Sequence, residues 1–310
     1  MKDHAPPDGH AHFPAGQPPQ RPEHVFVTKQ PDLTDSEYQS IANFVHKASG
    51  INLLDGKKEL VRARLAKRIN QLQFRDFKTY FKHVMTDSSG DELVFLLDAL
   101  ATNLTSFWRE PQHFDFMAKT LLPELEQRRK RPGGGGPRLR VWSCACSSGE
   151  EPYTIAMVVL DKSPYFGHGG DFRILATDLS TKVLNIAKRG EYGPESVKNI
   201  PPACLHSYLA KVPHEKGGDH WRVQDSVRRL VSFRRFNLMD PLPIKNPLDL
   251  IFCRNVMIYF DRATIADLVN KFHSTLEPGG YLFIGHSESL SGLQHPFQYV
   301  APCIYRKVTP

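Results

Sequence analysis

The chain has 310 residues, of which 40% are hydrophobic and 24% charged, and its formal net charge is +7. This length allows two domains with well-buried cores, and the composition is typical of a globular protein. No apolar run approaches the roughly 20 residues that span a bilayer, and the polar N-terminus is unlike a signal peptide, so we expect a cytoplasmic protein. The positive charge favours an acidic partner of unspecified kind.

Residues 1–30 differ in composition from the rest of the chain. They hold six prolines, four histidines and almost no residues that could pack together. We interpret this segment as a disordered leader. Its histidines could catch a metal ion, but no metal site is expected where a folded framework is missing.

Apolar residues recur at helical spacing over residues 31–105, which predicts a small all-helical domain. The positions include Tyr38, Ile41, Val45, Val61, Leu65 and Ile69. A further helix is predicted from Pro111 to Arg129, because proline suits its first turn and basic residues suit its end. The run RRKRPGGGGPR then predicts a flexible loop, so residues 106–136 are interpreted as a linker helix followed by a Gly-rich loop.

Strand-like runs alternate with helical runs over residues 137–310, which predicts an α/β domain with a mostly parallel, doubly wound sheet. The alternation is interrupted at about 207–236 by three short strand-like segments around a Gly-Gly turn. These segments are Tyr208–Val212, Trp221–Gln224 and Leu230–Phe233. We interpret them as a small antiparallel β insert, the alternative being an ordinary long connection.

The segment SCACSSGEEPY, residues 143–153, lies between the first strand and the first helix of this domain, where α/β proteins bind ligands. One residue separates Cys144 from Cys146, whereas redox pairs and half zinc sites have two, and no second Cys/His pair follows at zinc-finger spacing. The five cysteines are odd in number and mostly embedded in apolar runs, as reduced core residues are. We therefore expect no metal or redox site here.

A phosphate-binding loop is also disfavoured at this turn. Gly149 stands alone where a dinucleotide loop needs three glycines, and Glu150 and Glu151 carry negative charge where a phosphate would lie. The same glutamates also suit the first turn of a helix, which is a purely structural alternative.

Asp178 ends the next strand, 27 residues after Glu151, about where a doubly wound fold places the acid that binds ribose hydroxyls. Capping of the following helix is the alternative. Together, a ribose-binding acid and a loop that repels phosphate favour a cationic adenosine ligand such as S-adenosylmethionine.

Six motifs, taken in order, resemble those of the CheR family of chemotaxis receptor methyltransferases. They are TNLTSFWREPQHF (102–114), VWSCACSSGEEPY (141–153), ILATDLS (174–180), FNLMDP (236–241), IFCRNVMIYFD (251–261) and GGYLFIGHSESL (279–290). The resemblance extends from about Leu33 to Arg306. It implies a Rossmann-like S-adenosylmethionine-dependent methyltransferase domain after the all-α domain, and protein-glutamate O-methyltransferase activity.

The resemblance also implies the residues of the site. Those expected to bind S-adenosylmethionine, or its product S-adenosylhomocysteine, are Asn103, Thr105, Arg109, Glu151, Asp178, Asn237, Leu238, Asn255 and Val256. Arg109 and Tyr259 are the candidate catalytic residues. A guanidinium such as that of Arg109 can hold the methionyl carboxylate with two hydrogen bonds. Tyr259 is expected to shape the methyl-transfer site, with simple packing as the alternative. The motif residues His286, Ser287 and Glu288 receive no role.

Methyl transfer from a sulfonium to a carboxylate requires no strong general base, because the nucleophile is already ionised at neutral pH. We expect positioning of the two reactants to dominate, an effect that can supply roughly 7–11 kcal/mol. Exclusion of water from the pocket should add to it.

The segment from Lys57 to Arg68 contains six basic residues and only one acidic residue, Glu59. On a helix, Lys57, Arg64 and Arg68 share one face beside an apolar stripe. A solvated charged face is the ordinary interpretation. By resemblance, this helix meets the glutamate-bearing helices of chemoreceptors, so these three residues are the candidate substrate-binding residues.

The expected partners are the cytoplasmic domains of methyl-accepting chemoreceptors, with membrane contact only through them, and the enzyme itself is expected to be a monomer. Whether a receptor tail docks on the β insert stays open. One alternative is a nucleic-acid methyltransferase, although CRNVMIYF replaces the N-P-P-Y type of motif and no nucleic-acid partner is expected. The other is a catalytically silent adaptor that binds S-adenosylmethionine.

Overall fold

The computed structural model describes residues 32–53, 56–128, 138–213, 217–242 and 244–308. The predicted leader and most of the predicted Gly-rich loop lie outside these residues. Among the described residues, no helix combines the length and the apolar character needed to cross a membrane.

The predicted all-helical region is confirmed. It consists of α1 Asp35–Ser49, α2 Lys58–Gln71, α3 Phe77–Thr86 and α4 Asp91–Leu100. Side chains that follow the helical spacing close its core, among them Ile41, Val45, Val61, Leu65, Ile69 and Phe77. Thr34 and Glu37 form a capping box at the start of α1, which ends at Gly50 in the left-handed conformation.

Helical elements are present where the linker helix was predicted, with one irregularity. It is built from α5 Gln112–Phe116, η1 Met117–Leu121 and α6 Leu122–Arg128, which follow one another without a break. The middle element is a π-helical turn, a local widening that sequence periodicity does not report.

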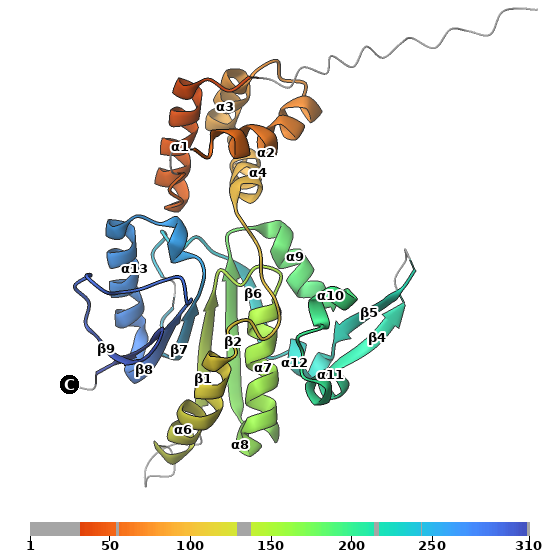
Figure 1. The fold of residues 1–310 in the computed structure, drawn as a ribbon, viewed down its shortest axis with the longest axis vertical. Helices are drawn as coiled ribbons and strands as arrows, with labels where there is room; N and C mark the ends of the chain where they lie inside the picture. Colours follow the sequence, from red (N-terminus) through yellow and green to blue (C-terminus); the bar gives the residue numbers. More distant parts are fainter. Residues whose placement is uncertain (1–31, 54–55, 129–137, 214–216, 243, 309–310) are drawn as a thin grey trace, which may run out of the picture. The chain divides into compact units, whose positions relative to one another are not determined.

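The predicted doubly wound sheet is present with seven strands in the order β6-β2-β1-β7-β8-β10-β9 (Figure 1). The strands are β1 Arg138–Cys144, β2 Asp171–Asp178, β6 Val231–Arg235, β7 Leu248–Cys253, β8 Leu276–Ile284, β9 Phe297–Ala301 and β10 Ile304–Lys307. The first five in spatial order run parallel, and β10 is antiparallel to both β8 and β9. The longer helices are α7 Glu150–Lys162, α9 Thr181–Arg189 and α13 Arg262–Thr275. Two short elements, α8 Pro164–Gly167 and η2 Met257–Tyr259, follow α7 and β7.

A small antiparallel sheet is present, but the predicted strand Leu230–Phe233 does not belong to it. The small sheet contains β3 Glu191–Tyr192, β5 Asp219–Val223 and β4 Leu209–Pro213, in that order. The short helices around it are α10 Pro194–Val197, α11 Pro202–Tyr208 and α12 Asp225–Arg228. The third predicted segment forms β6, which pairs in parallel with β2 at the edge of the large sheet. Alternating burial identifies a strand but not its partner, which is why this part of the prediction is wrong.

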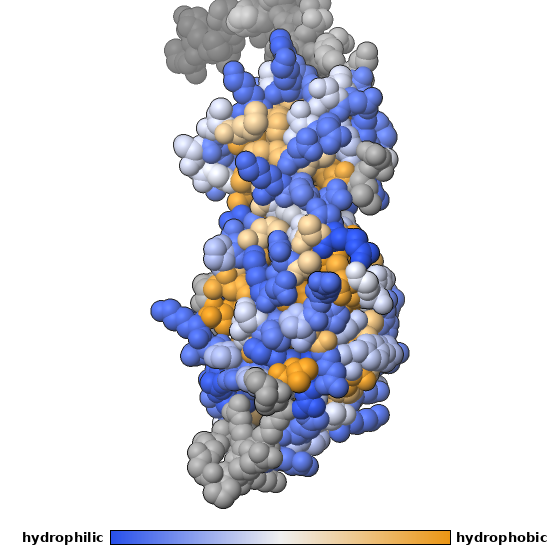
Figure 2. Space-filling model, turned by 90° about the vertical axis from the view of Figure 1, so that its left-hand side faces the viewer, coloured by the Kyte–Doolittle hydropathy of each residue, from blue (hydrophilic) through white to orange (hydrophobic). Residues whose placement is uncertain are grey.

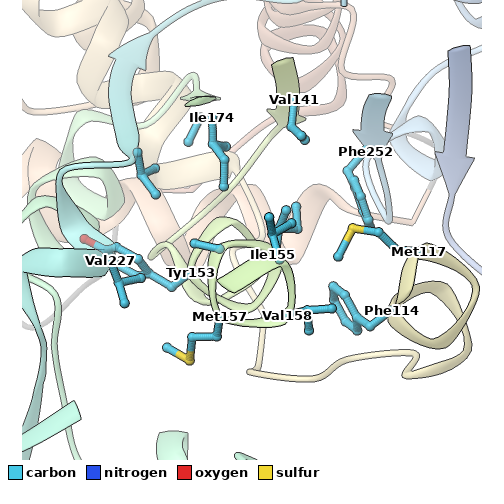
Figure 3. Packing of buried hydrophobic residues seen from close by; sticks show 14 of the residues in the cluster. Phe114, Met117, Val141, Tyr153, Ile155, Met157, Val158, Ile174, Val227 and Phe252 are labelled. Atoms are coloured by element: carbon cyan, nitrogen blue, oxygen red, sulfur yellow. The ribbon is translucent and has the colours of Figure 1, made fainter. Parts of the chain in front are cut away.

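Helices cover both faces of the large sheet, and successive residues of β1 face opposite sides. Val141 packs with α7 and the linker helix, whereas Trp142 packs with α13. Figure 3 shows Ile155 and Val158 of α7 among Phe114, Met117, Val141, Ile174 and Phe252. Each fully buried side chain of this size contributes about 1.5–3 kcal/mol, so this packing holds the loop before α7 in place.

Hydrophilic residues predominate on the face of the molecule shown in Figure 2, with several hydrophobic patches between them. The most exposed large hydrophobic side chain of the described residues is Leu104, at 81%. Ile258 is 46% exposed. Both residues lie next to the pocket described below.

Candidate active site

One pocket is formed at the carboxyl ends of β1, β2 and β7, together with the segment that leads from α4 to the linker helix. This is the edge at which doubly wound sheets bind ligands. All ten residues that the sequence assigned to the cofactor or the catalytic centre line it, namely Asn103, Thr105, Arg109, Glu151, Asp178, Asn237, Leu238, Asn255, Val256 and Tyr259. The structure therefore brings together residues that are up to 156 positions apart.

The end of α1 contributes to the same pocket, through Ser49 and Ile51. Hydrogen bonds join this segment to the sheet domain. The amide of Asn52 donates to the carbonyl of Tyr259 at 2.7 Å. The Asn237 side chain donates to the carbonyl of Ala48 at 2.7 Å, so it links the two parts of the pocket.

The β1–α7 loop is held by Asp178 at the end of β2. Its Oδ2 accepts the amide of Ser147 at 2.8 Å, and its Oδ1 accepts the amide of Ser180 at 2.8 Å. Burial raises the pKa of Asp178, while these amides oppose the rise. A carboxylate has about four acceptor positions, so two remain for hydroxyl groups of a ligand. This geometry fits the predicted ribose contact as well as a structural role.

Glycine is required where α7 begins. Gly149 has a φ of +97°, and a Cβ at this position would lie 2.8 Å from the Cβ of Ala187. The two glutamates that follow point in different directions. Glu151 lines the pocket, whereas Glu150 accepts the hydroxyl of Ser148 at 2.7 Å and does not line it. Of the two carboxylates predicted to repel phosphate, only that of Glu151 therefore faces the pocket.

Glu151 is paired inside the protein with Arg254, the residue that follows β7. Nη1 of Arg254 donates to Glu151 Oε2 at 3.0 Å, and Nη2 donates to Glu110 Oε2 at 2.9 Å. The arginine side chain is 2% exposed, and the two glutamates are 12% and 13% exposed. Arg254 also donates to the carbonyl of Arg109. One guanidinium thus ties the start of α7 to the segment before the linker helix.

Glu288 fixes the loop after β7. Its carboxylate accepts the amides of Asn255 at 3.0 Å, Val256 at 2.9 Å and Met257 at 2.7 Å. It also accepts the amide of Gly285, which follows β8. Burial raises the pKa of Glu288, and the four amides act against that rise. The carboxylate holds in register the two residues, Asn255 and Val256, that line the pocket.

Strained backbone is concentrated around this pocket. Seven non-glycine residues of the described chain have a positive φ, and five of them line the pocket or flank Arg109: Trp108, Glu110, Ala145, Ser147 and Asn255. Such conformations cost about 1–3 kcal/mol each and persist only where the surroundings enforce them. Arg109 itself donates from Nη1 to the carbonyl of Leu104 at 2.9 Å, which orients its guanidinium.

Comparison with known proteins assigns this arrangement to a family. Residues 36–101 match the CheR methyltransferase all-alpha domain, and residues 103–305 match the CheR methyltransferase SAM-binding domain. The chain belongs to the CheR methyltransferase family. The fold class, the methyltransferase activity and S-adenosylmethionine as the cofactor, all expected from the sequence, are thereby confirmed.

Curated relatives match the chain over nearly its whole length. The chemotaxis protein methyltransferase of Borreliella burgdorferi is 38% identical, covering 89% of this chain and 95% of its own. A probable chemotaxis protein methyltransferase of Rhizobium etli is 39% identical, covering 86% and 97%. The chemotaxis protein methyltransferase of Escherichia coli is 35% identical, covering 90% and 93%.

The three basic residues predicted to bind substrate differ in their surroundings. Lys57, immediately before α2, is exposed. Arg64 donates to the carbonyls of Leu100 and Ala101 at 2.8 and 3.1 Å, at the end of α4. Arg68 pairs with the buried Glu92 at 2.6 Å. In this CheR-family chain, Arg64 and Arg68 therefore hold α2 against α4, and only Lys57 offers its charge to solvent.

Three residues of the site were not predicted to take part: Glu110, Arg254 and Glu288. Each lies inside a motif that the sequence had singled out; Glu110 and Arg254 lie next to predicted site residues, whereas Glu288 lies among motif residues that received no role. A charged residue directly after the apolar run Leu250–Cys253 could have indicated Arg254, because strand ends in this fold point at the ligand. The two glutamates carried no such signal, since their partners are distant in sequence.

Proposed function

We propose that this chain acts in the cytoplasm as a monomer and transfers the methyl group of S-adenosylmethionine to glutamate side chains on the cytoplasmic helices of chemoreceptors. The observation that carries this proposal is the single pocket that collects all ten predicted residues in a chain of the CheR methyltransferase family. The same ten residues are proposed as its cofactor and catalytic residues.

The pocket residues fit this ligand chemically. When bound, S-adenosylmethionine supplies an electrophilic methyl group on a cationic sulfur. Asp178 keeps acceptor positions for ribose hydroxyls, and Arg109 is proposed to grip a carboxylate. Glu151 forms an ion pair with Arg254, and its carboxylate is also proposed to accept a hydrogen bond from an ammonium group. Asn255 and Val256, held by Glu288, form the wall proposed to orient the acceptor carboxylate and exclude water.

A protein substrate is supported by the apolar surface at the pocket. Leu104 lines the pocket and is nevertheless 81% exposed, and Ile258 lies between the lining residues Val256 and Tyr259. Exposed apolar surface beside a site is a feature of surfaces that bind proteins. We propose that the apolar positions flanking a receptor glutamate pack here.

Methylation of receptor-bearing membranes tests the proposal. The native protein with S-adenosylmethionine should produce base-labile methyl esters, measured as released methanol, on receptors with glutamate at the acceptor positions and not with alanine. Arg109→Ala and Asp178→Asn should each lower cofactor affinity by at least about tenfold, since each removes a hydrogen bond to or from a charged group. Arg229→Ala, which changes an exposed arginine outside the pocket, is the control. Full activity of both pocket variants would refute these assignments.

The receptor-binding role of α2 can be separated from its structural role. Lys57→Ala should leave thermal unfolding unchanged and weaken receptor binding a few-fold at low salt only, because surface charges are screened as salt rises. Arg68→Ala should lower stability by about 1–3 kcal/mol, because Glu92 would stay buried without its partner. Receptor titrations at two salt concentrations and urea unfolding measure both effects. Unchanged stability of Arg68→Ala would contradict the structural role.

A further inference from the structure

His113 of α5 is a fully buried histidine without hydrogen bonds. Its exposure is 0%, and neither Nδ1 nor Nε2 has a hydrogen-bond partner among the described residues. The Glu110 carboxylate comes to 3.6 Å from Nδ1, which is beyond hydrogen-bonding distance. Buried polar atoms are almost always paired, so a ring with two free nitrogens needs an explanation.

Two other ligand-type side chains meet His113. His286, which follows β8, and Cys303, in the turn between β9 and β10, offer ligand atoms that all lie within 4.8 Å of one another and of His113. His286 is exposed and Cys303 is partly exposed, so the cluster is reached from solvent. The other four cysteines are buried. Cys303 has a φ of +63°, a strained conformation for a residue with a side chain.

Two imidazoles and one thiol are the donors that thiophilic transition metals prefer. Burial and the nearby charge of Arg254 lower the pKa of His113 to about 3. The exposed His286 can rotate to complete the set.

We propose that His113, His286 and Cys303 form a Zn²⁺ site beside the methyl-transfer pocket. Ligating histidines usually direct their second ring nitrogen toward a carboxylate, and Glu110 lies at Nδ1 of His113 in this way. Glu110 also accepts the backbone amide of His286 at 3.3 Å and pairs with Arg254. Glu110 thus links the proposed metal site to Arg254, which lines the pocket. This inference goes beyond the proposed methyltransferase function and does not depend on it.

Cobalt provides a direct spectroscopic test with the full-length, reduced protein. Co²⁺ bound at this site should give a thiolate-to-cobalt charge-transfer band in the near ultraviolet, because Cys303 is a ligand. Cys303→Ser should abolish the band, and Cys204→Ser should leave it unchanged. His286→Ala should weaken cobalt binding more than about tenfold, a loss expected when one ligand is removed. Absence of the band from the native protein, or its persistence in Cys303→Ser, would overturn the proposal.

Competition of Zn²⁺ with a chromophoric chelator gives a second, independent measurement. The native protein should bind Zn²⁺ at least about tenfold more tightly than His286→Ala or Cys303→Ser. A variant with glutamine in place of the four leader histidines His4, His10, His12 and His24 should bind as tightly as the native protein. Equal affinity of the native protein and both site variants, or loss of binding in the leader variant, would assign the metal to the leader and overturn the proposal.

Discussion

Arg254→Met is expected to lower the free energy of unfolding by about 3–5 kcal/mol, the loss found when one partner of a buried ion pair is removed. Arg254 is 2% exposed and faces two carboxylates, those of Glu110 and Glu151. Without the guanidinium both would be left in a poorly solvated site. Methionine keeps most of the side-chain volume, so the effect measures the charge and its hydrogen bonds rather than a cavity.

Urea unfolding of both proteins measures this difference, and its dependence on pH provides an internal check. Burial raises the pKa of Glu110, but the Arg254 charge outweighs burial and holds that pKa below the ordinary value of 4.5. The stability that this pair contributes is therefore present above pH 4.5 and is lost as the pH falls through the lowered pKa. The part of the difference between native protein and variant that comes from the Glu110 pair should shrink in the same range.

Lys198→Ala is the matched control for Arg254→Met, because Lys198 and Glu195 form an ion pair on the surface, 62% and 86% exposed. The urea concentration at the unfolding midpoint of Lys198→Ala should equal that of the native protein, because water screens such surface ion pairs. If Arg254→Met unfolded at the same urea concentration as Lys198→Ala, the ion pairs of Arg254 with Glu110 and Glu151 would not stabilise the protein.

The resemblance of its motifs to those of the CheR family indicated the residues that line the pocket, and several of these residues lie where a strand ends. Asp178 ends β2 and Asn255 closely follows β7, and parallel strands bring their carboxyl ends to one edge. The partners of these residues were harder to predict. Glu110 and Arg254 are 144 positions apart, and no local rule relates two such residues. The pairing of Glu151 with Arg254, 103 positions away, was not predicted for the same reason.

The basic face of α2 shows the same limit. Helical spacing correctly placed Arg64 and Arg68 on one side of α2 next to its apolar stripe. Spacing did not reveal that α4 would lie against that side, where Glu92 and the last carbonyls of α4 take up both guanidiniums. The prediction for the residues of β6 was wrong for the same reason, because it assigned them to the small antiparallel sheet, whereas they pair with β2 in the large sheet. Periodicity defines a face of an element, and tertiary packing decides what meets it.

Glu288→Gln is expected to lower kcat by about 100-fold while changing cofactor affinity much less. The Glu288 carboxylate accepts four backbone amides, three of them from the loop that carries Asn255 and Val256. A glutamine offers one acceptor oxygen and turns an amino group toward amide donors, so the loop must shift. A displacement of about 1 Å at reacting groups can cost 100-fold in rate.

Separate measurements of S-adenosylhomocysteine affinity and of kcat on receptor membranes test this role for Glu288. Glu277→Gln is the control, because Glu277 lies on β8, the strand that precedes Glu288, and pairs with Arg138 at 3.1 Å, outside the pocket. A purely structural role of Glu288 would lower stability, affinity and rate together. A positioning role lowers kcat in a protein that still binds the cofactor, because the loop that Glu288 holds through the amides of residues 255–257 is proposed to orient the acceptor carboxylate. Native kcat in Glu288→Gln would contradict that role.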